Sequence, residues 1–276
     1  MVHTFMKKKI KCLFYDKFVE CNSSLSELCE ICEMIFLALP TPFDMTQNTY
    51  DISAIHDTLS FLSDHDYCGI VIIKSTVLPG TTTILQSRYN NINLLHCPEF
   101  LSARTAQNDF ENPRQIILGI LSSTGNDVIL FVTNFLRTVF PNVPIRICTS
   151  GESECTKILC NAFYASKIQL FNEFYQYVGS MRGLDFNQVK KNMINQGWIN
   201  PMHTSVPGHD NHISFGGACF PKDMRALLGH MKYRHTPHQV IEAVLCERDD
   251  MRKDENLIMP FPQISRATSA NSQYLC

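Results

Sequence analysis

Short apolar runs alternate with amphipathic segments through the first 150 residues, and this alternation restricts the possible folds more than any other feature of the chain. Most of the runs are apolar throughout, as expected for strands that are covered on both faces. Alternating strands and helices favour a doubly wound, parallel sheet. The pattern predicts strands at 10–15, 34–39, 70–75, 92–97, 115–120 and 144–149, with helices at 51–64 and 123–140.

The pattern changes at Glu152. Apolar residues then recur every three or four positions, and neither proline nor glycine interrupts them before Gly179, which predicts one long helix over about 153–181. The segment that follows, 195–217, is rich in loop-forming residues, and loops of this length in compact domains are often functional. Two further helices are expected at about 221–233 and 237–253.

The chain is therefore predicted to hold an incomplete α/β domain at 1–151 and an all-helical domain at 152–254, joined by the long helix. Residues 255–276 are polar and without pattern, and we expect a mobile tail there. The long helix carries more apolar positions than one small domain would cover. We therefore expect it to pack against its counterpart in a homodimer.

Composition excludes several classes of function. The 276 residues are 45% hydrophobic and 18% charged, and the formal net charge is −2, so no basic field indicates nucleic acid or an acidic membrane as a partner. No apolar run approaches the roughly 20 residues that cross a bilayer. The first residues contain no apolar core with a cleavage site of the secretory kind. We expect a cytoplasmic protein.

The chain contains twelve cysteines, scattered through predicted strands and helices and not arranged as a disulfide framework. Cys29 and Cys32 are the closest pair. A metal or redox site is one interpretation of their spacing, but no second pair lies at zinc-site spacing, and isolated cysteines commonly act as small buried hydrophobic residues. The sequence predicts no metal site.

One cysteine has an unusual setting. Cys219 follows Gly216 and Gly217 and stands just before "FPKD", where proline indicates the first turn of a helix. The unpaired amides and positive dipole at such a helix start stabilise a thiolate, and the glycines permit close approach of a ligand. Asp223, four residues on, lies on the same side as the sulfur. The alternative is a buried cysteine beside an ordinary helix start.

Further polar residues stand where chemistry is expected. Lys157 and Asn161 are four apart on the long helix, so they share a face and together can hold an oxyanion, although a solvated helix face is the alternative. Thr76 and Glu99 each follow a predicted strand, at the edge where parallel sheets bind ligands. A carboxylate at Glu99 can serve as a general base or as a cap.

Taken together, these segments resemble the nucleotide-sugar 6-dehydrogenase family. The resemblance covers roughly residues 10–250. It is carried by "IFLALPTP", "VIIKSTVLPGTT", "CPEFLSARTA", "ESECTKILCNAF" and "FGGACFPKDMRAL", in the family's order and at its spacing. It implies a Rossmann-like NAD-binding domain. It also implies oxidation of the primary alcohol of a sugar nucleotide, such as UDP-glucose, through a thiohemiacetal and a thioester on a cysteine.

The resemblance assigns roles to individual residues. Cys219 matches the nucleophile, and Asp223 matches its polar partner in proton transfer. Lys157 and Asn161 match the residues that stabilise the oxyanion, Glu99 the carboxylate that assists thioester hydrolysis, and Thr76 a residue that positions water. The residues implied in NAD binding are Asp16, Thr41, Thr76, Glu99 and Lys222, and those implied in the sugar-nucleotide site are Phe100, Leu101, Lys157, Asn161, Phe215, Gly216 and Gly217.

One feature of the family pattern is absent. Dinucleotide binding normally begins with a strand, a glycine-rich turn and a helix, whereas the first glycine here is Gly69. The first β–α unit is therefore expected to be missing. A C-terminal nucleotide-binding domain is also expected to be missing, because the chain ends soon after the last predicted helix. Two hypotheses follow. The chain is a short or truncated NAD-dependent sugar-nucleotide dehydrogenase, or it is a catalytically silent relative that acts as a binding or oligomerisation module.

Overall fold

A computed structural model describes residues 1–21 and 23–252, which form two compact units. Of the described residues, the first unit comprises Met1–Pro42 and Tyr50–Lys157, and the second comprises Phe43–Thr49 and the chain from Ile158 to Arg252. The division falls within the long helix, a little after the boundary before Glu152 that the sequence predicts. The expected tail at 255–276 lies outside the described residues.

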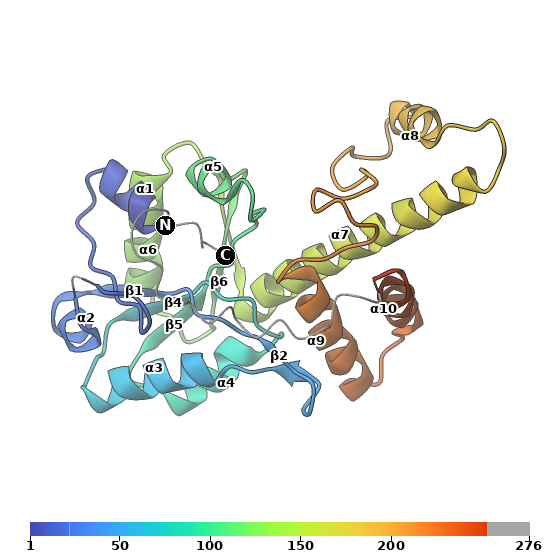
Figure 1. Cartoon of the computed structure of the whole chain (residues 1–276). Helices are drawn as coiled ribbons and strands as arrows, with labels where there is room; N and C mark the ends of the chain where they lie inside the picture. Colours follow the sequence, from blue (N-terminus) through green and yellow to red (C-terminus); the bar gives the residue numbers. More distant parts are fainter. Residues whose placement is uncertain (22, 253–276) are drawn as a thin grey trace. The chain divides into compact units, whose positions relative to one another are not determined.

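A five-stranded sheet with helices on both faces forms the first unit (Figure 1). Its strands pair in the order β1-β4-β5-β6-β7. The α/β fold class is confirmed, with one correction. β6 runs antiparallel to β5, meeting it only at His96 and Gly119, so the sheet is mostly and not wholly parallel. The strands are β1 (Met34–Leu37), β4 (Ile70–Ile73), β5 (Asn93–His96), β6 (Ile116–Ile120) and β7 (Ile145–Thr149).

The two faces of the sheet are both apolar, as uninterrupted hydrophobic strands require. On one face, Val71 and Ile73 of β4 pack with α3 (Ser53–Asp64), α4 (Thr81–Arg88) and α2 (Leu25–Ile31). On the other, Ile70 and Ile72 of the same strand pack with α6, α5 and α1. The bounds of these last helices are Asn126–Val139, Ala106–Glu111 and Val2–Lys7.

The strand predicted at residues 10–15 is wrong. These residues have no regular secondary structure, and β1 is an edge of the sheet as described, so the segment has no strand beside it. An extended segment without a pairing partner leaves its amides and carbonyls unsatisfied as a strand. The preceding helix α1 is well anchored, because Phe5 is buried against Phe36, Phe110 and Phe135.

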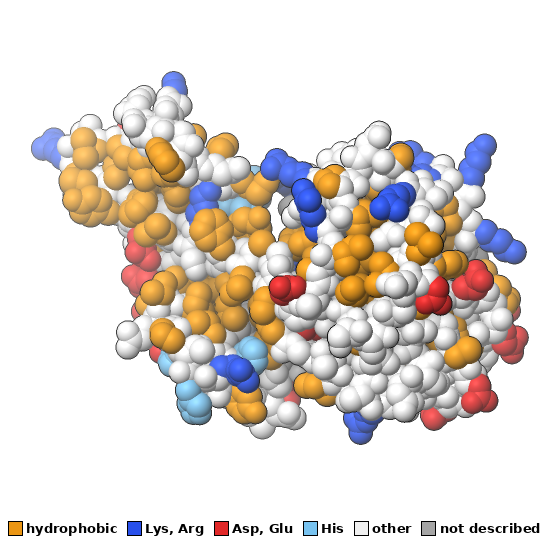
Figure 2. Space-filling model, turned by 180° about the vertical axis from the view of Figure 1, so that it is seen from behind, with side chains coloured by type: hydrophobic (Ala, Val, Ile, Leu, Met, Phe, Trp, Pro, Cys, Tyr) orange, Lys and Arg blue, Asp and Glu red, His pale blue; other side chains and the backbone are white. Residues whose placement is uncertain are grey.

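The second unit is mainly helical. The predicted long helix is α7 (Ser150–Gly179), which begins in the first unit, and the two helices expected near its end are α9 (Phe220–Tyr233) and α10 (Gln239–Met251). A further helix, α8 (Phe186–Asn195), follows α7. Figure 2 shows hydrophobic side chains gathered over the far end of α7. No helix within the described residues is both long and apolar enough to cross a membrane.

The segment predicted to be all-helical, from residue 152, contains no strand in its described part, but the second unit also includes a piece from the first half of the chain. A short hairpin of β2 (Phe43–Asp44) and β3 (Thr49–Tyr50) lies against α9, and most of it belongs to the second unit. Gly229 in the middle of α9 makes this possible, because a Cβ there would lie 2.1 Å from the carbonyl oxygen of Asn48. The hairpin tip therefore requires glycine at that position.

Candidate active site

The loops that follow β1 and β4 are tied together at the carboxyl edge of the sheet. Thr41 is buried, and its hydroxyl donates to the backbone oxygen of Thr76 over 2.8 Å. The Ser75 hydroxyl donates to the Leu39 oxygen over 2.6 Å and accepts from the Leu39 amide over 2.9 Å. Thr41 and Thr76, both predicted from sequence, thus lie side by side at the edge where such sheets bind ligands.

A largely buried lysine, Lys74, which sequence reasoning did not single out, pairs with Glu99. Nζ of Lys74 lies 2.7 Å from Oε1 of Glu99 and 3.3 Å from Sγ of Cys97. Burial acts against the charge of Lys74, but the neighbouring Cys97 and Glu99 outweigh it and raise the lysine's pKa. The lysine at the end of an apolar strand was a visible signal, since lysine is almost never buried unless it is paired. Glu99 is therefore a paired carboxylate and not a helix cap.

The two aromatic or aliphatic residues after Glu99 have different surroundings. Phe100 is 37% exposed, and Nζ of Lys157 lies 5.3 Å from the centroid of its ring, which is cation–π distance. Leu101 instead packs partly buried against the core on the α6 face of the sheet. The structure therefore brings Phe100 and Lys157 together, while Leu101 is occupied in packing.

The first turn of α7 carries two buried groups that serve the first unit. Glu154 is fully buried and accepts from the amides of Gly80 and Thr82 over 2.6 and 2.7 Å. The N-terminal amides of α4 are thus already bonded to an internal carboxylate. Ser153 lies 2.8 Å from Nδ1 of His96, and burial lowers the pKa of that histidine to about 3. These residues fix α7 to the sheet.

Cys219 is the N-cap residue of α9 and is exposed, with Pro221 in the first turn, as the sequence predicts. The helix start is well formed, because the Asp223 amide donates to the Cys219 carbonyl over 3.0 Å. Its side chain makes no capping hydrogen bond to the helix, but the residue stands at the positive end of the helix dipole. This is the setting in which a thiolate is stabilised.

Asp223 contacts two of the other predicted residues, Asn161 and Lys222. The aspartate is fully buried, and its Oδ2 accepts from Nδ2 of Asn161 over 2.6 Å, while its Oδ1 lies 2.6 Å from Nζ of Lys222. Asn161 is itself buried on α7, one turn from Lys157. The second unit therefore assembles Asn161, Lys222 and Asp223 at the start of the helix that Cys219 caps.

The loop before Cys219 contains the remaining predicted residues. Phe215 is buried, with its ring centroid 6.5 Å from that of Phe220. Gly217 has φ +77°, a left-handed conformation that favours glycine, and open space around it. Gly216 is different, since a Cβ there would lie 2.1 Å from Nη1 of Arg252. Arg252 and its neighbour Arg248 were missed in the sequence, although two arginines four apart on an amphipathic helix were a usable signal.

Asp16 does not stand at the end of a strand, because the strand predicted before it is absent. The residue is exposed, and its Oδ1 accepts from the Phe18 amide in a local turn over 2.8 Å. Its predicted role at a ribose is therefore without the structural support that a neighbouring strand would give. Within residues 1–21 and 23–252, no group of three or more histidine, cysteine or acidic residues is arranged to hold a metal.

Comparison with known proteins agrees with this arrangement. Residues 4–133 match the NAD-binding domain of the UDP-glucose/GDP-mannose dehydrogenase family, and residues 151–247 match the central domain of the same family. The chain belongs to this family. NAD is the cofactor of the matched domain, as the sequence predicts.

Individual relatives support the same assignment. A UDP-glucose 6-dehydrogenase of Campylobacter jejuni is 28% identical over 255 residues, which cover 90% of this chain and 62% of the relative. One from Streptococcus pneumoniae is 27% identical over 80% of this chain and 55% of the relative. A solved UDP-glucose dehydrogenase of Pyrobaculum islandicum has a TM-score of 0.71 and 25% identity, covering 84% of this chain and 53% of its own. The chain thus spans about half to three-fifths of these relatives.

The described residues fit NAD only in part. The carboxyl edge of the sheet presents Thr41, Thr76 and Glu99, which suit the nicotinamide half. No glycine-rich turn with its backbone amides occurs before Gly69 in the given sequence. Amides of that kind are what normally bind a pyrophosphate. The nicotinamide side of the site is better supported than the adenosine side.

Proposed function

We propose that this protein is an NAD-dependent nucleotide-sugar 6-dehydrogenase that works through Cys219. The observation that supports the proposal most strongly is the buried contact of 2.6 Å between Asn161 and Asp223 at the start of α9. It joins two motifs that are 62 residues apart in sequence, and it lies one helical turn from an exposed cysteine at the helix N-terminus. Family membership supplies the reaction class.

The proposed chemistry has four balanced steps. The primary alcohol of the sugar loses a hydride and a proton to become an aldehyde, and the Cys219 thiol adds across the carbonyl to form a thiohemiacetal. Loss of a second hydride and proton gives a thioester. Water then breaks the C–S bond and releases the acid and the thiol. When bound, NAD accepts the hydride in each oxidation. A cysteine suits this scheme because it is nucleophilic and is also a good leaving group.

The other residues of the second unit have defined tasks in this proposal. Asp223 acts with Cys219 in moving protons through water. Asn161, held by Asp223, and Lys157, one turn earlier on α7, stabilise the negative oxygen that develops during each addition. Phe215, Gly216 and Gly217 form the loop beside the sugar nucleotide.

The residues at the edge of the sheet serve the nicotinamide half and the hydrolysis. Glu99, held in place by Lys74, accepts the proton of the water that attacks the thioester. Thr76 positions that water, and Thr41 supports Thr76 through its backbone oxygen. Lys222 keeps the role in NAD binding that the family resemblance implies. Asp16 lies outside any strand and Leu101 packs against the core, so the proposal assigns neither of them a task. A cytoplasmic location and a homodimeric state are part of the same proposal.

A binding screen with one variant tests the function directly. We expect UDP-glucose or a related UDP- or GDP-sugar to raise the melting temperature of the wild-type protein, because a ligand that binds the native state stabilises it. Mixed with an aldehyde-level UDP-sugar, the wild type should form a covalent adduct on Cys219 that the intact mass reveals, whereas Cys219→Ser should form none. Failure of every sugar nucleotide to shift the melting temperature would contradict the proposal.

The alternative, a silent binding module, gives a different result in the same experiment. Such a protein would bind a sugar nucleotide with equal affinity in the wild type and in Cys219→Ser, and would form no adduct. The intact set of Cys219, Asp223, Asn161 and Lys157 favours the enzyme.

A further inference from the structure

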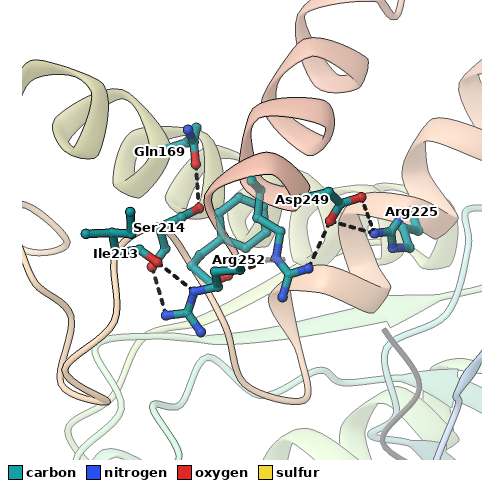
Figure 3. Close-up of polar contacts among 8 residues, drawn as sticks. Gln169, Ile213, Ser214, Arg225, Asp249 and Arg252 are labelled. Atoms are coloured by element: carbon teal, nitrogen blue, oxygen red, sulfur yellow. Dashed lines mark hydrogen bonds and ion pairs between the residues drawn. The ribbon is translucent and has the colours of Figure 1, made fainter. Parts of the chain in front are cut away.

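Two arginines at the end of α10 hold the loop that leads to Cys219 (Figure 3). Arg252 is 5% exposed and donates from Nε to the Ile213 oxygen over 2.6 Å. Its Nη2 donates to the Ser214 oxygen over 3.1 Å and to Oδ2 of Asp210 over 2.6 Å. A single guanidinium thus bonds three groups along one turn of the loop.

Arg248, one helical turn earlier, continues the pattern. It is 3% exposed and donates from Nε to the Phe215 oxygen over 3.2 Å. Its Nη1 donates to Asp249 over 2.9 Å, and Asp249 also accepts from Arg225 of α9 over 2.7 Å. The loop before Cys219 and the helix after it are therefore both bonded to α10.

The three consecutive carbonyls at 213–215 are thus bonded by two arginines. Carbonyls buried in a loop outside regular structure must find partners elsewhere, and a planar guanidinium with five donors supplies several at fixed angles. On the opposite side, the Ser214 hydroxyl donates to Oε1 of Gln169 on α7, which is fully buried. The loop is fixed from α7 and from α10.

Gly216 lies directly against the guanidinium of Arg252. A Cβ at Gly216 would be 2.1 Å from Nη1 and 2.8 Å from Cζ of Arg252. At Gly217, by contrast, a Cβ would meet nothing within 4 Å, and only the backbone φ of +77° favours glycine. Glycine is therefore required at the two adjacent positions for different physical reasons. One leaves room for Arg252, and the other permits a turn.

We propose that Arg248 and Arg252 are positioning residues that set the conformation of the loop at 213–217 and thereby the accessibility of Cys219, and that Gly216 is required by Arg252 and not by a bound ligand. The relevance of these contacts to catalysis rests on the function proposed above. The positioning of the loop by the two arginines does not depend on that function.

A double-mutant cycle tests the proposal. The proteins are wild type, Gly216→Ala, Arg252→Ala and the double variant, and the readout is the rate at which Cys219 is alkylated in the native protein, divided by the rate for exposed Cys68 in the first unit. We expect Gly216→Ala alone to change this ratio by at least about threefold, and to have much less effect once Arg252 is removed, because contacting residues are not additive. Equal effects of Gly216→Ala in both backgrounds would overturn the proposal.

Two further variants make the result specific. Gly217→Ala is the matched control, since its backbone effect should be the same with and without Arg252. Arg252→Lys keeps the positive charge but loses the planar, multi-donor guanidinium group. It should therefore alter the ratio of Cys219 to Cys68 alkylation rates without the large loss of melting temperature that is expected of Arg252→Ala. If Arg252→Ala fails to fold, the cycle is run with Arg252→Lys, and additivity there overturns the proposal in the same way.

Ligand binding separates this inference from the proposed function. Alkylation needs neither NAD nor turnover, so coupling between positions 216 and 252 would be measured even in a catalytically silent protein. If Gly216 instead serves close approach of a ligand, Gly216→Ala will weaken UDP-glucose equally with Arg252 and without it. That outcome would contradict the assignment of Gly216 while leaving the proposed function intact.

Discussion

The residues that carry the proposed chemistry are supported by buried polar groups whose charge states depend on their surroundings. His96 is fully buried, and burial, aided by the nearby charges of Lys74 and Lys157, lowers its pKa to about 3. It therefore stays neutral at physiological pH, with its ring nitrogens beside Ser153 and the Ser75 carbonyl. A neutral histidine here avoids placing a third positive charge next to two lysines, which would be costly in a dry interior.

The buried His96 predicts how stability depends on pH. The unfolded chain takes up a proton near pH 6.5, but the folded protein does not until about pH 3, so stability is lost as the pH falls below 6.5. The loss from this group is at most about 1.4 kcal/mol per pH unit. We expect His96→Gln to flatten the slope of unfolding free energy between pH 6 and pH 4.5 by up to that amount, as measured by urea denaturation. An unchanged slope would show that His96 does not titrate as described.

Cys219 should be the most reactive of the twelve thiols. It is exposed at the N-terminus of α9, while burial raises the pKa of several others. Those with raised pKa values are Cys12, Cys29, Cys32, Cys97, Cys148 and Cys155. Brief alkylation with limiting reagent, followed by peptide mass spectrometry, should label Cys219 first. The strictest comparison is with Cys68 and Cys246, which are also exposed, and faster labelling of either would count against the site.

At the scale of elements, the hydrophobic pattern predicted the helices and strands that have a periodicity of their own. It failed for segments whose structure depends on contacts with distant parts of the chain. The five strands of the sheet and helices α3, α6, α7, α9 and α10 were found because each carries its own periodicity. The segment at 10–15 has a strand pattern but no neighbouring strand. The β2–β3 hairpin is too short to give a pattern, and it depends on the absence of a side chain at Gly229.

The candidate site divides in the same way. Cys219, Asp223, Asn161 and Glu99 were found because their motifs mark them. Arg252 was not, because its importance comes from three acceptors that lie about 40 residues earlier in the chain. The spacing of Arg248 and Arg252 marks two cations on one side of a helix, but it does not show which loop carbonyls they bind.

One face of α7 predicts self-association. Leu159, Phe163, Leu170 and Tyr177 are substantially exposed at spacings of four, seven and seven, which place them in one stripe along the helix. We expect a homodimer through this stripe. Sedimentation of the wild type should show a dimer at micromolar concentration, and Phe163→Glu should shift it toward monomer. Ile84→Glu, an exposed apolar position in the first unit, is the matched control and should leave the dimer intact. A strictly monomeric wild type would contradict the prediction.

At the scale of the whole molecule, the proposed functions are divided between two compact units that share α7. Lys157 is the last residue of the first unit and Asn161 belongs to the second, so this helix carries one of the proposed oxyanion residues in each unit. The first unit also carries Thr41, Thr76 and Glu99, which suit the nicotinamide half of the cofactor. The sugar-nucleotide residues of the second unit do not depend on the strands at the N-terminal edge of the sheet, so the two ligands should differ in how strongly this chain binds them.

That difference is open to measurement. The 276-residue polypeptide has no glycine before Gly69, and Asp16 lies exposed outside any strand. Several charge-assisted hydrogen bonds to the pyrophosphate are therefore lacking, and at about 1.5–3 kcal/mol each their loss should weaken NAD by at least two to three orders of magnitude. We expect calorimetry to give a millimolar or weaker NAD affinity, with little turnover, while UDP-glucose still raises the melting temperature. A micromolar NAD affinity, or steady NADH production from UDP-glucose, would mean that another segment of this chain supplies the missing amides.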